Sequence, residues 1–115
     1  MASIREDVVI ERTFQCMRLI HERGDISTRE LAERMKISNG AAYYVLSALI
    51  EKGYVKTENF KNNPNKSGYI YLLTSVGISE KARLTSKFIR RKKAEYKALK
   101  VEIERLERED AQLYE

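Results

Sequence analysis

The first half of the chain alternates apolar and polar positions with the period of an α-helix. Residues from about Arg5 to Arg23 predict a first helix, with Gly24 as the glycine that caps its C-terminus. Asp25 to Ser27 lead onward, and Ile26 is a candidate for a very short strand that pairs with a later hairpin. The expected buried stripe of the first helix is Ile10, Thr13, Phe14, Met17 and Ile20.

Two shorter helices follow between Ser27 and Gly53. Ser27 and Glu30 form a capping box, in which the hydroxyl accepts from a first-turn N–H and the glutamate reaches back to the cap's own N–H. Ser38 is a second N-cap, and Gly53 stands where a helix ends in a left-handed residue. Two amphipathic helices across a tight turn predict a helix-turn-helix. Their expected buried positions are Leu31, Ala32, Met35, Ala42, Val45, Leu46 and Leu49.

The outward face of the second of these helices indicates DNA binding. It carries no charge from Ser38 to Ile50, whereas an ordinary surface helix more often carries Glu and Lys. A helix enters the major groove only if its leading turn is slim and offers hydrogen-bonding groups to base edges. The bland alternative is a helical hairpin whose tyrosines pack on neighbouring elements. The outward residues are Asn39, Gly40, Ala41, Tyr43, Tyr44 and Ser47.

After Gly53 the period changes from helical to alternating. Tyr54 to Phe60 and Tyr69 to Leu73 predict two strands, rich in β-branched and aromatic residues. The loop between them has turn-forming residues and two lysines but no acid, which is typical of the wing of a winged helix. An ordinary solvated hairpin loop is the alternative. The full set of expected DNA-contacting residues is Ser27, Thr28, Arg29, Lys36, Ser38, Asn39, Gly40, Ala41, Tyr43, Tyr44, Ser47, Lys61, Asn62, Asn65 and Lys66.

Thr74 is expected to cap a long helix that runs from about Ser75 towards the C-terminus. With Tyr96 as heptad position a, the run from Ile89 to Leu106 keeps the spacing of a coiled coil, interrupted by Lys92. We therefore expect a dimerisation helix, although it could instead fold back onto its own domain. The four basic residues at 90–93 face DNA phosphates or are simply solvated. The expected dimerisation residues are Ile89, Tyr96, Leu99, Ile103 and Leu106.

Composition narrows the class of protein. The chain has 115 residues, 43% hydrophobic and 34% charged, with a net charge of +5 that mildly favours an anionic partner. No segment reads as a signal peptide or a membrane span, so a cytoplasmic protein is expected. One cysteine and one histidine are too few for a cysteine-rich metal site or a zinc site. A lone cysteine among apolar helical positions, such as Cys16, is more often a small core residue than a redox switch. His21 has no Cys, His or Asp partner at the spacing of metal ligands.

These elements predict a mainly α (α+β) fold, a winged helix-turn-helix domain followed by a long C-terminal helix. The expected boundary separates residues 1–76, the DNA-binding domain, from residues 77–115, the dimerisation helix. Catalytic residues are not expected, because there is no phosphate-binding glycine loop and no pair of carboxylates outside helical surface runs. No cofactor, metal or small-molecule effector is predicted.

The segment LIEKGYV, from Leu49 to Val55, resembles the MarR (multiple antibiotic resistance regulator) family. The combined segments RELAERMKIS, ENFKNNPNK, YIYLLT and GISEKARLT resemble a subgroup of short MarR-like regulators associated with exopolysaccharide gene clusters. The resemblance implies a homodimer that binds double-stranded DNA sequence-specifically, reading bases with residues 39–47 and placing residues 62–66 at the wing tip. The wing departs from the Asp-x-Arg pair common in the family, and it carries Asn63-Pro64-Asn65-Lys66 instead.

The function expected from the sequence is therefore a homodimeric transcriptional regulator, with polysaccharide biosynthesis genes as a candidate target. A winged-helix module for protein–protein assembly, with the C-terminal helix docking a partner, is the competing reading. RNA binding is a third, but a helix shaped for the B-form major groove does not fit the deep, narrow groove of A-form RNA.

Overall fold

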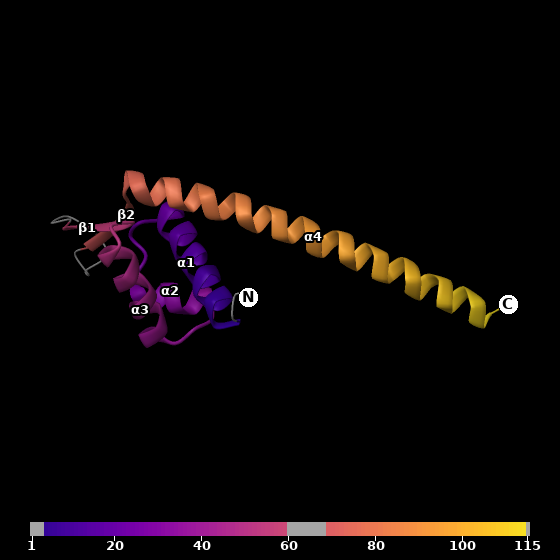
Figure 1. Ribbon diagram of the computed structural model, residues 1–115. Coiled ribbons are helices and arrows are strands. Elements are labelled where there is room, and N and C mark those ends of the chain that lie inside the picture. Colours follow the sequence, from indigo (N-terminus) through magenta and orange to yellow (C-terminus); the bar gives the residue numbers. More distant parts are fainter. Residues whose placement is uncertain (1–3, 60–68, 115) are drawn as a thin grey trace. The chain divides into compact units, whose positions relative to one another are not determined.

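The computed structural model describes residues 4–59 and 69–114, which form four helices and two strands (Figure 1). In chain order these are α1 (Ile4–Glu22), α2 (Thr28–Met35), α3 (Asn39–Glu51), β1 (Val55–Asn59), β2 (Tyr69–Leu73) and α4 (Ser75–Leu113). The strands form one antiparallel hairpin, with Val55 opposite Leu73 and Asn59 opposite Tyr69. This is the predicted winged-helix order, and the fold class is confirmed.

Gly24 does not cap α1 in the way that the sequence suggested. The left-handed residues of the described chain are Lys36 and Gly53, so Gly24 is not one of them. The Gly24 carbonyl accepts from the Tyr71 N–H at 2.9 Å, and a Cβ at Gly24 would lie 2.5 Å from the Tyr71 oxygen. Glycine is required here because the backbone of β2 passes so closely. Gly24 therefore makes the backbone contact to the hairpin that was expected of Ile26, which lies buried outside any strand.

The caps of α2 and α3 are formed largely as predicted. The Ser27 hydroxyl accepts from the Glu30 N–H at 3.0 Å, and the Ser38 hydroxyl accepts from the Ala41 N–H at 3.1 Å. The Glu30 carboxylate was expected to return to the cap but contacts the Arg23 guanidinium instead. α2 ends at Met35, and the left-handed backbone of its C-cap Lys36 (φ 58°), which was not predicted, turns the chain towards α3.

Gly53 ends α3 as predicted, in the left-handed conformation with φ 79°. Its N–H donates to Ile50 at 3.0 Å, and the next N–H, of Tyr54, donates to Leu49 at 3.0 Å. This pair of hydrogen bonds is a Schellman motif. Thr74 continues the junction: its hydroxyl donates to the Gly53 carbonyl at 2.5 Å and accepts from the Gly77 N–H at 3.0 Å, capping α4 as expected. The end of α3 is thereby tied to the start of α4.

The core lies where α1, α2, α3 and the hairpin meet. Helix α2 packs on α3, and α1 contacts both helices and β2, while α3 contacts β1. All seven predicted buried positions of α2 and α3 are buried. The α1 stripe is only partly buried, because Ile10, Thr13 and Phe14 are intermediate in exposure. The largest fully buried side chains are Met17, Leu31, Leu49, Val55 and Cys16.

The chain divides into two compact units, Met1–Arg83 and Leu84–Glu115, with the boundary inside α4. Helix α4 has 39 residues and is therefore about 58 Å long. The boundary expected at residues 76 and 77 stays a prediction. No helix within the described ranges is long and apolar enough to cross a lipid bilayer.

Candidate nucleic-acid interface

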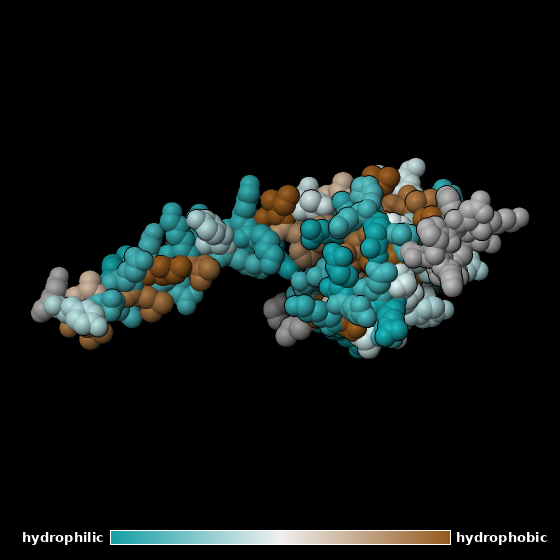
Figure 2. All heavy atoms as spheres, turned by 180° about the vertical axis from the view of Figure 1, so that it is seen from behind, coloured by the Kyte–Doolittle hydropathy of each residue, from teal (hydrophilic) through white to brown (hydrophobic). Residues whose placement is uncertain are grey.

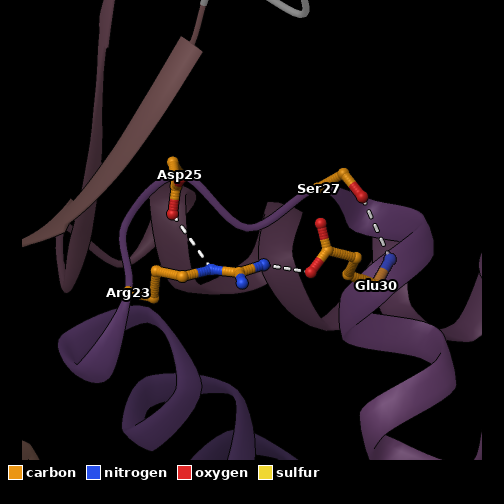
Figure 3. A network of polar contacts seen from close by, with 4 residues as sticks. All are labelled: Arg23, Asp25, Ser27 and Glu30. Atoms are coloured by element: carbon orange, nitrogen blue, oxygen red, sulfur yellow. Dashed lines mark hydrogen bonds and ion pairs between the residues drawn. The ribbon is translucent and has the colours of Figure 1, made fainter. Parts of the chain in front are cut away.

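The start of α2 is held by a small polar network around Arg23 (Figure 3). The Arg23 guanidinium lies 3.0 Å from an Asp25 oxygen and also contacts the Glu30 carboxylate. The contact with Glu30 joins the end of α1 to the first turn of α2, and the contact with Asp25 lies within the connection between them. The side chains are about half exposed, so each ion pair contributes well under about 1 kcal/mol.

Helix α3 presents the face that the sequence assigned to DNA. Its buried side is formed by Ala42, Val45, Leu46 and Leu49, which places the remaining positions outward. Among the predicted outward residues, Asn39, Gly40, Tyr43 and Tyr44 are exposed, while Ala41 and Ser47 are partly exposed. The two tyrosines are 65% and 74% exposed, so they do not pack on neighbouring elements of this chain. The packed-tyrosine alternative therefore finds no support.

The leading turn of α3 is narrow because Gly40 has no side chain. A Cβ built at Gly40 would meet nothing within 4 Å, and the residue does not have a positive φ. Neither packing nor backbone conformation therefore explains a glycine at this position. Glycine inside a helix lowers stability by roughly 1 kcal/mol relative to alanine. The fold alone therefore does not explain the glycine at position 40. A glycine at this position leaves room for another molecule to approach the turn closely.

Basic residues flank this face on the α2 side. Lys36 is exposed at the turn between the two helices, and Arg29 is exposed in the first turn of α2. Arg29 lies 3.7 Å from Glu33, a solvent-exposed pair that a phosphate can readily replace. The hydroxyls of Ser27 and Ser38, both predicted contacts, each accept a capping hydrogen bond, and their protons remain available for donation to a phosphate. Thr28 follows Ser27 in the chain and is partly exposed.

A groove between α1 and α3 adjoins the tyrosine face and was not predicted. Its volume is about 530 Å³, and Tyr44 stands on its edge. Arg12 from α1 and Lys52 from the end of α3 also line it. Lys52 follows Tyr44 by eight residues at the end of the same helix, whereas Arg12 reaches this groove because α1 packs beside α3. No pattern within α1 signals that Arg12 lies near α3.

The hairpin follows α3 as a wing does, but its tip cannot be compared with the prediction. Lys61, Asn62, Asn65 and Lys66 lie outside the described residues. The strands that lead to the tip are described, and on them Lys56 pairs with Glu58 at 3.7 Å.

The side chains that could carry other chemistry are few. Cys16 is fully buried, and burial raises the pKa of its thiol to about 12, which is the environment of a core residue. His21 is exposed near the end of α1. Among residues 4–59 and 69–114, no group of three or more His, Cys, Asp or Glu side chains is placed to hold a metal ion.

Residues 11–63 match the MarR family. This range contains α2, α3 and β1, the elements on which the candidate face is built. The search of curated proteins found no match for the chain.

Solved structures of MarR-family regulators share the fold. A cysteine-to-serine variant of E. coli MarR complexed with operator DNA is 24% identical, with a TM-score of 0.53 over 64% of this chain and 51% of that one. The S. aureus MepR–DNA complex is 16% identical, with a TM-score of 0.59 over 73% of this chain and 60% of that one. A MarR/EmrR-family regulator from Acinetobacter sp. ADP1 is 19% identical, with a TM-score of 0.57 over 87% of this chain and 75% of that one. The chain thus spans about half the length of the E. coli MarR chain.

Proposed function

We propose that this protein is a sequence-specific regulator of transcription that binds double-stranded DNA as a homodimer. The observation that carries the proposal is the exposed, uncharged face of α3, which is held out by a capped helix-turn-helix and begins with a slim first turn. The match to the MarR family over the same elements supports it. Solved relatives of this fold include complexes with DNA, although at these identities they establish the fold alone.

In the proposed complex, α3 lies in the major groove. Asn39 is placed in the first turn, where an amide can pair with the two hydrogen-bonding groups of an adenine edge. Tyr43 and Tyr44 lie on the exposed face of α3, where their hydroxyls can reach bases or phosphates. Lys36 and Arg29 are positioned on the α2 side to contact phosphates, which fix the register but carry no sequence information. The wing residues 61–66 complete the proposed interface.

The first test is selection of binding sites from a random pool of duplex DNA at near-physiological salt, followed by sequencing. Enrichment of one palindrome is expected, with half-site centres about 34–36 Å or a multiple apart, because each protomer of a dimer reads one half-site. Weak, steeply salt-dependent binding without enrichment refutes a sequence reader. It would favour the competing module for protein–protein assembly.

Asn39→Ala tests the assignment of the reading face. We expect it to weaken binding to the selected site by about 1–3 kcal/mol while binding to random duplex is nearly unchanged, because only the base contact is lost. The matched control is Ser79→Ala, an exposed helical position outside the proposed interface. Equal losses on both duplexes would show that Asn39 does not read a base.

The homodimer is proposed to form through α4. The predicted dimerisation residues are exposed in the single chain, with Tyr96 and Leu99 at 69% and 54%. Replacing Leu99 and Ile103 by Lys is expected to give a monomer in sedimentation, since two charges per chain would enter the apolar contact between the helices. Arg108→Lys on the opposite side of the helix is the control. An unchanged dimer mass in the double variant would place the interface elsewhere.

We propose polysaccharide biosynthesis genes as the regulated targets, on the strength of the sequence segments that resemble the exopolysaccharide-associated subgroup. The selected DNA site provides the test, because its occurrences upstream of genes in the source genome identify the targets. Occurrence mainly at unrelated genes would reject this assignment and leave DNA binding intact.

A further inference from the structure

The proposed DNA interface does not use the exposed seam of α4, which is the row of heptad positions a and d: Ile89, Lys92, Tyr96, Leu99, Ile103, Leu106, Asp110 and Leu113. Large apolar side chains lie on one side of the helix, and a groove of about 300 Å³ runs between them. Figure 2 shows apolar side chains gathered along this helix with hydrophilic ones beside them. Soluble proteins rarely leave such a stripe exposed, so it indicates a docking surface. The residues that line the groove are Tyr96, Leu99, Lys100, Ile103, Glu104 and Glu107.

Charge changes sign along the same helix, with Val101 at the midpoint. Residues 88–100 contain six basic residues and one acidic residue, whereas residues 102–114 contain two basic and five acidic residues. In a parallel pair of helices each half faces its own copy, so positive lies beside positive and negative beside negative. In an antiparallel pair the basic half of each helix faces the acidic half of the other. Charge complementarity therefore favours the antiparallel arrangement.

The seam itself contains two charged residues, Lys92 and Asp110, and they also favour the antiparallel arrangement. In a parallel, in-register coiled coil, Lys92 would face the partner's Lys92 and Asp110 would face the partner's Asp110. In an antiparallel pair centred level with Val101, Lys92 faces the partner's Asp110, because each lies nine residues from the centre. Lys92 already contacts Glu95 at 3.3 Å, but both side chains are more than half exposed and remain available.

The remaining seam positions fit this register with apolar side chains on both helices. Leu99 faces the partner's Ile103, Tyr96 faces the partner's Leu106, and Ile89 faces the partner's Leu113. Moving the centre by one seam layer towards the N-terminus would bury Lys92 against the partner's Ile103. Moving it by one layer the other way would bury Asp110 against the partner's Leu99. Burying an unpaired charge against apolar groups is costly, so the register is fixed by these two residues.

We propose that α4 pairs with α4 of a second copy as an antiparallel coiled coil centred at Val101, with two seam ion pairs between Lys92 and the partner's Asp110. This inference rests on the proposed homodimer and assigns its orientation and register. The polar pair selects one alignment among the several that the apolar positions alone would allow, as buried polar residues do in other coiled coils.

Disulfide cross-linking of chains with one introduced cysteine tests the orientation in the full-length protein. We would prepare Lys92→Cys and Asp110→Cys separately, keeping the buried Cys16 in place, and oxidise each alone and as an equimolar mixture after subunit exchange. In the antiparallel pair, identical cysteines are 18 residues apart along the helices, about 27 Å, which is far beyond disulfide reach. Neither variant alone should cross-link, and the mixture should give a covalent heterodimer.

Matched controls come from the opposite side of the same helices. Ala94→Cys and Arg108→Cys lie seven residues on either side of Val101, so they are level with each other in the proposed pair but face away from the seam. Their mixture should stay at background cross-linking. Helix content measured by circular dichroism confirms that each variant folds.

Each other outcome overturns the proposal in a different way. Cross-linking of Lys92→Cys alone and Asp110→Cys alone would show a parallel dimer, which keeps the homodimer and rejects the orientation. Absence of cross-linking together with a monomer mass in sedimentation would reject the helix pair itself. Neither result affects the selection of DNA sites, so failure of this inference is distinguishable from failure of DNA binding. As a second readout, Lys92→Asp should weaken self-association at least tenfold, and Lys92→Asp with Asp110→Lys should restore it. In a parallel pair Lys92→Asp would exchange one like-charge contact for another and have little effect.

Discussion

Gly40 offers the sharpest test of the DNA interface, because the fold and the proposed function make opposite demands on it. A Cβ at this position meets nothing within 4 Å and the backbone is not left-handed, so Gly40→Ala introduces no clash in the free protein. Alanine gains helix propensity and reduces the entropy of the unfolded chain. We expect stabilisation by about 0.5–1 kcal/mol, less than the full interior value because Gly40 lies in the first turn.

In the complex with DNA, the same methyl group should lower the binding affinity. If the first turn of α3 approaches the groove closely, an added methyl group overpacks the contact, which costs about 1–3 kcal/mol in well-packed environments. Affinity for the selected site should therefore fall by about 5- to 150-fold while the melting temperature rises by about 2–5 °C. Fluorescence anisotropy on the selected duplex and thermal unfolding followed by circular dichroism measure the two effects.

Gly53→Ala is the matched control, because it should lower stability where Gly40→Ala raises it. Gly53 has φ 79°, a conformation that costs an alanine roughly 1–2 kcal/mol, so this variant should lose about 1 kcal/mol of stability after the gain in unfolded-state entropy. Its DNA affinity at temperatures well below melting should be unchanged. A Gly40→Ala protein that binds the selected site as tightly as the wild type would refute close approach at this turn. One that is less stable would refute the structural argument.

Two further predictions concern the fold. Gly77→Ala should destabilise the chain by about 1–3 kcal/mol in urea unfolding, because its Cβ would lie 2.0 Å from the Tyr54 carbonyl oxygen and backbone must move; an unchanged midpoint would contradict this contact. Cys16 should resist thiol reagents at pH 8 unless the chain unfolds, since burial raises its pKa to about 12 from an ordinary 9.0. The thiol's contribution to stability is fully present below pH 9 and is lost as pH rises towards 12, because the unfolded chain loses the proton first. Wild type compared with Cys16→Ala at pH 8 and pH 10.5 checks this, and a pH-independent difference would contradict it.

Local sequence determined the elements of this protein and most of their ends. Ser38 and Gly53 act as predicted because capping depends on a hydroxyl near the first N–H groups or on a backbone without Cβ, and both are properties of a few neighbouring residues. The buried stripes of α2 and α3 follow from helical periodicity in the same way. The charge reversal about Val101, from which the antiparallel pair is inferred, also stands in the sequence alone.

What only the tertiary structure decided concerns contacts between segments far apart in the chain. Gly24 reads locally as a helix cap, yet it is glycine because β2 passes within reach of its Cβ position. Glu30 reads as half of a capping box, yet its carboxylate pairs with Arg23, which lies at the end of another helix. Arg12 joins the face beside Tyr44 because α1 packs against α3. Periodicity reports which side of one helix is buried, but it carries no information about which other segment covers that side, and these residues depend on that second fact.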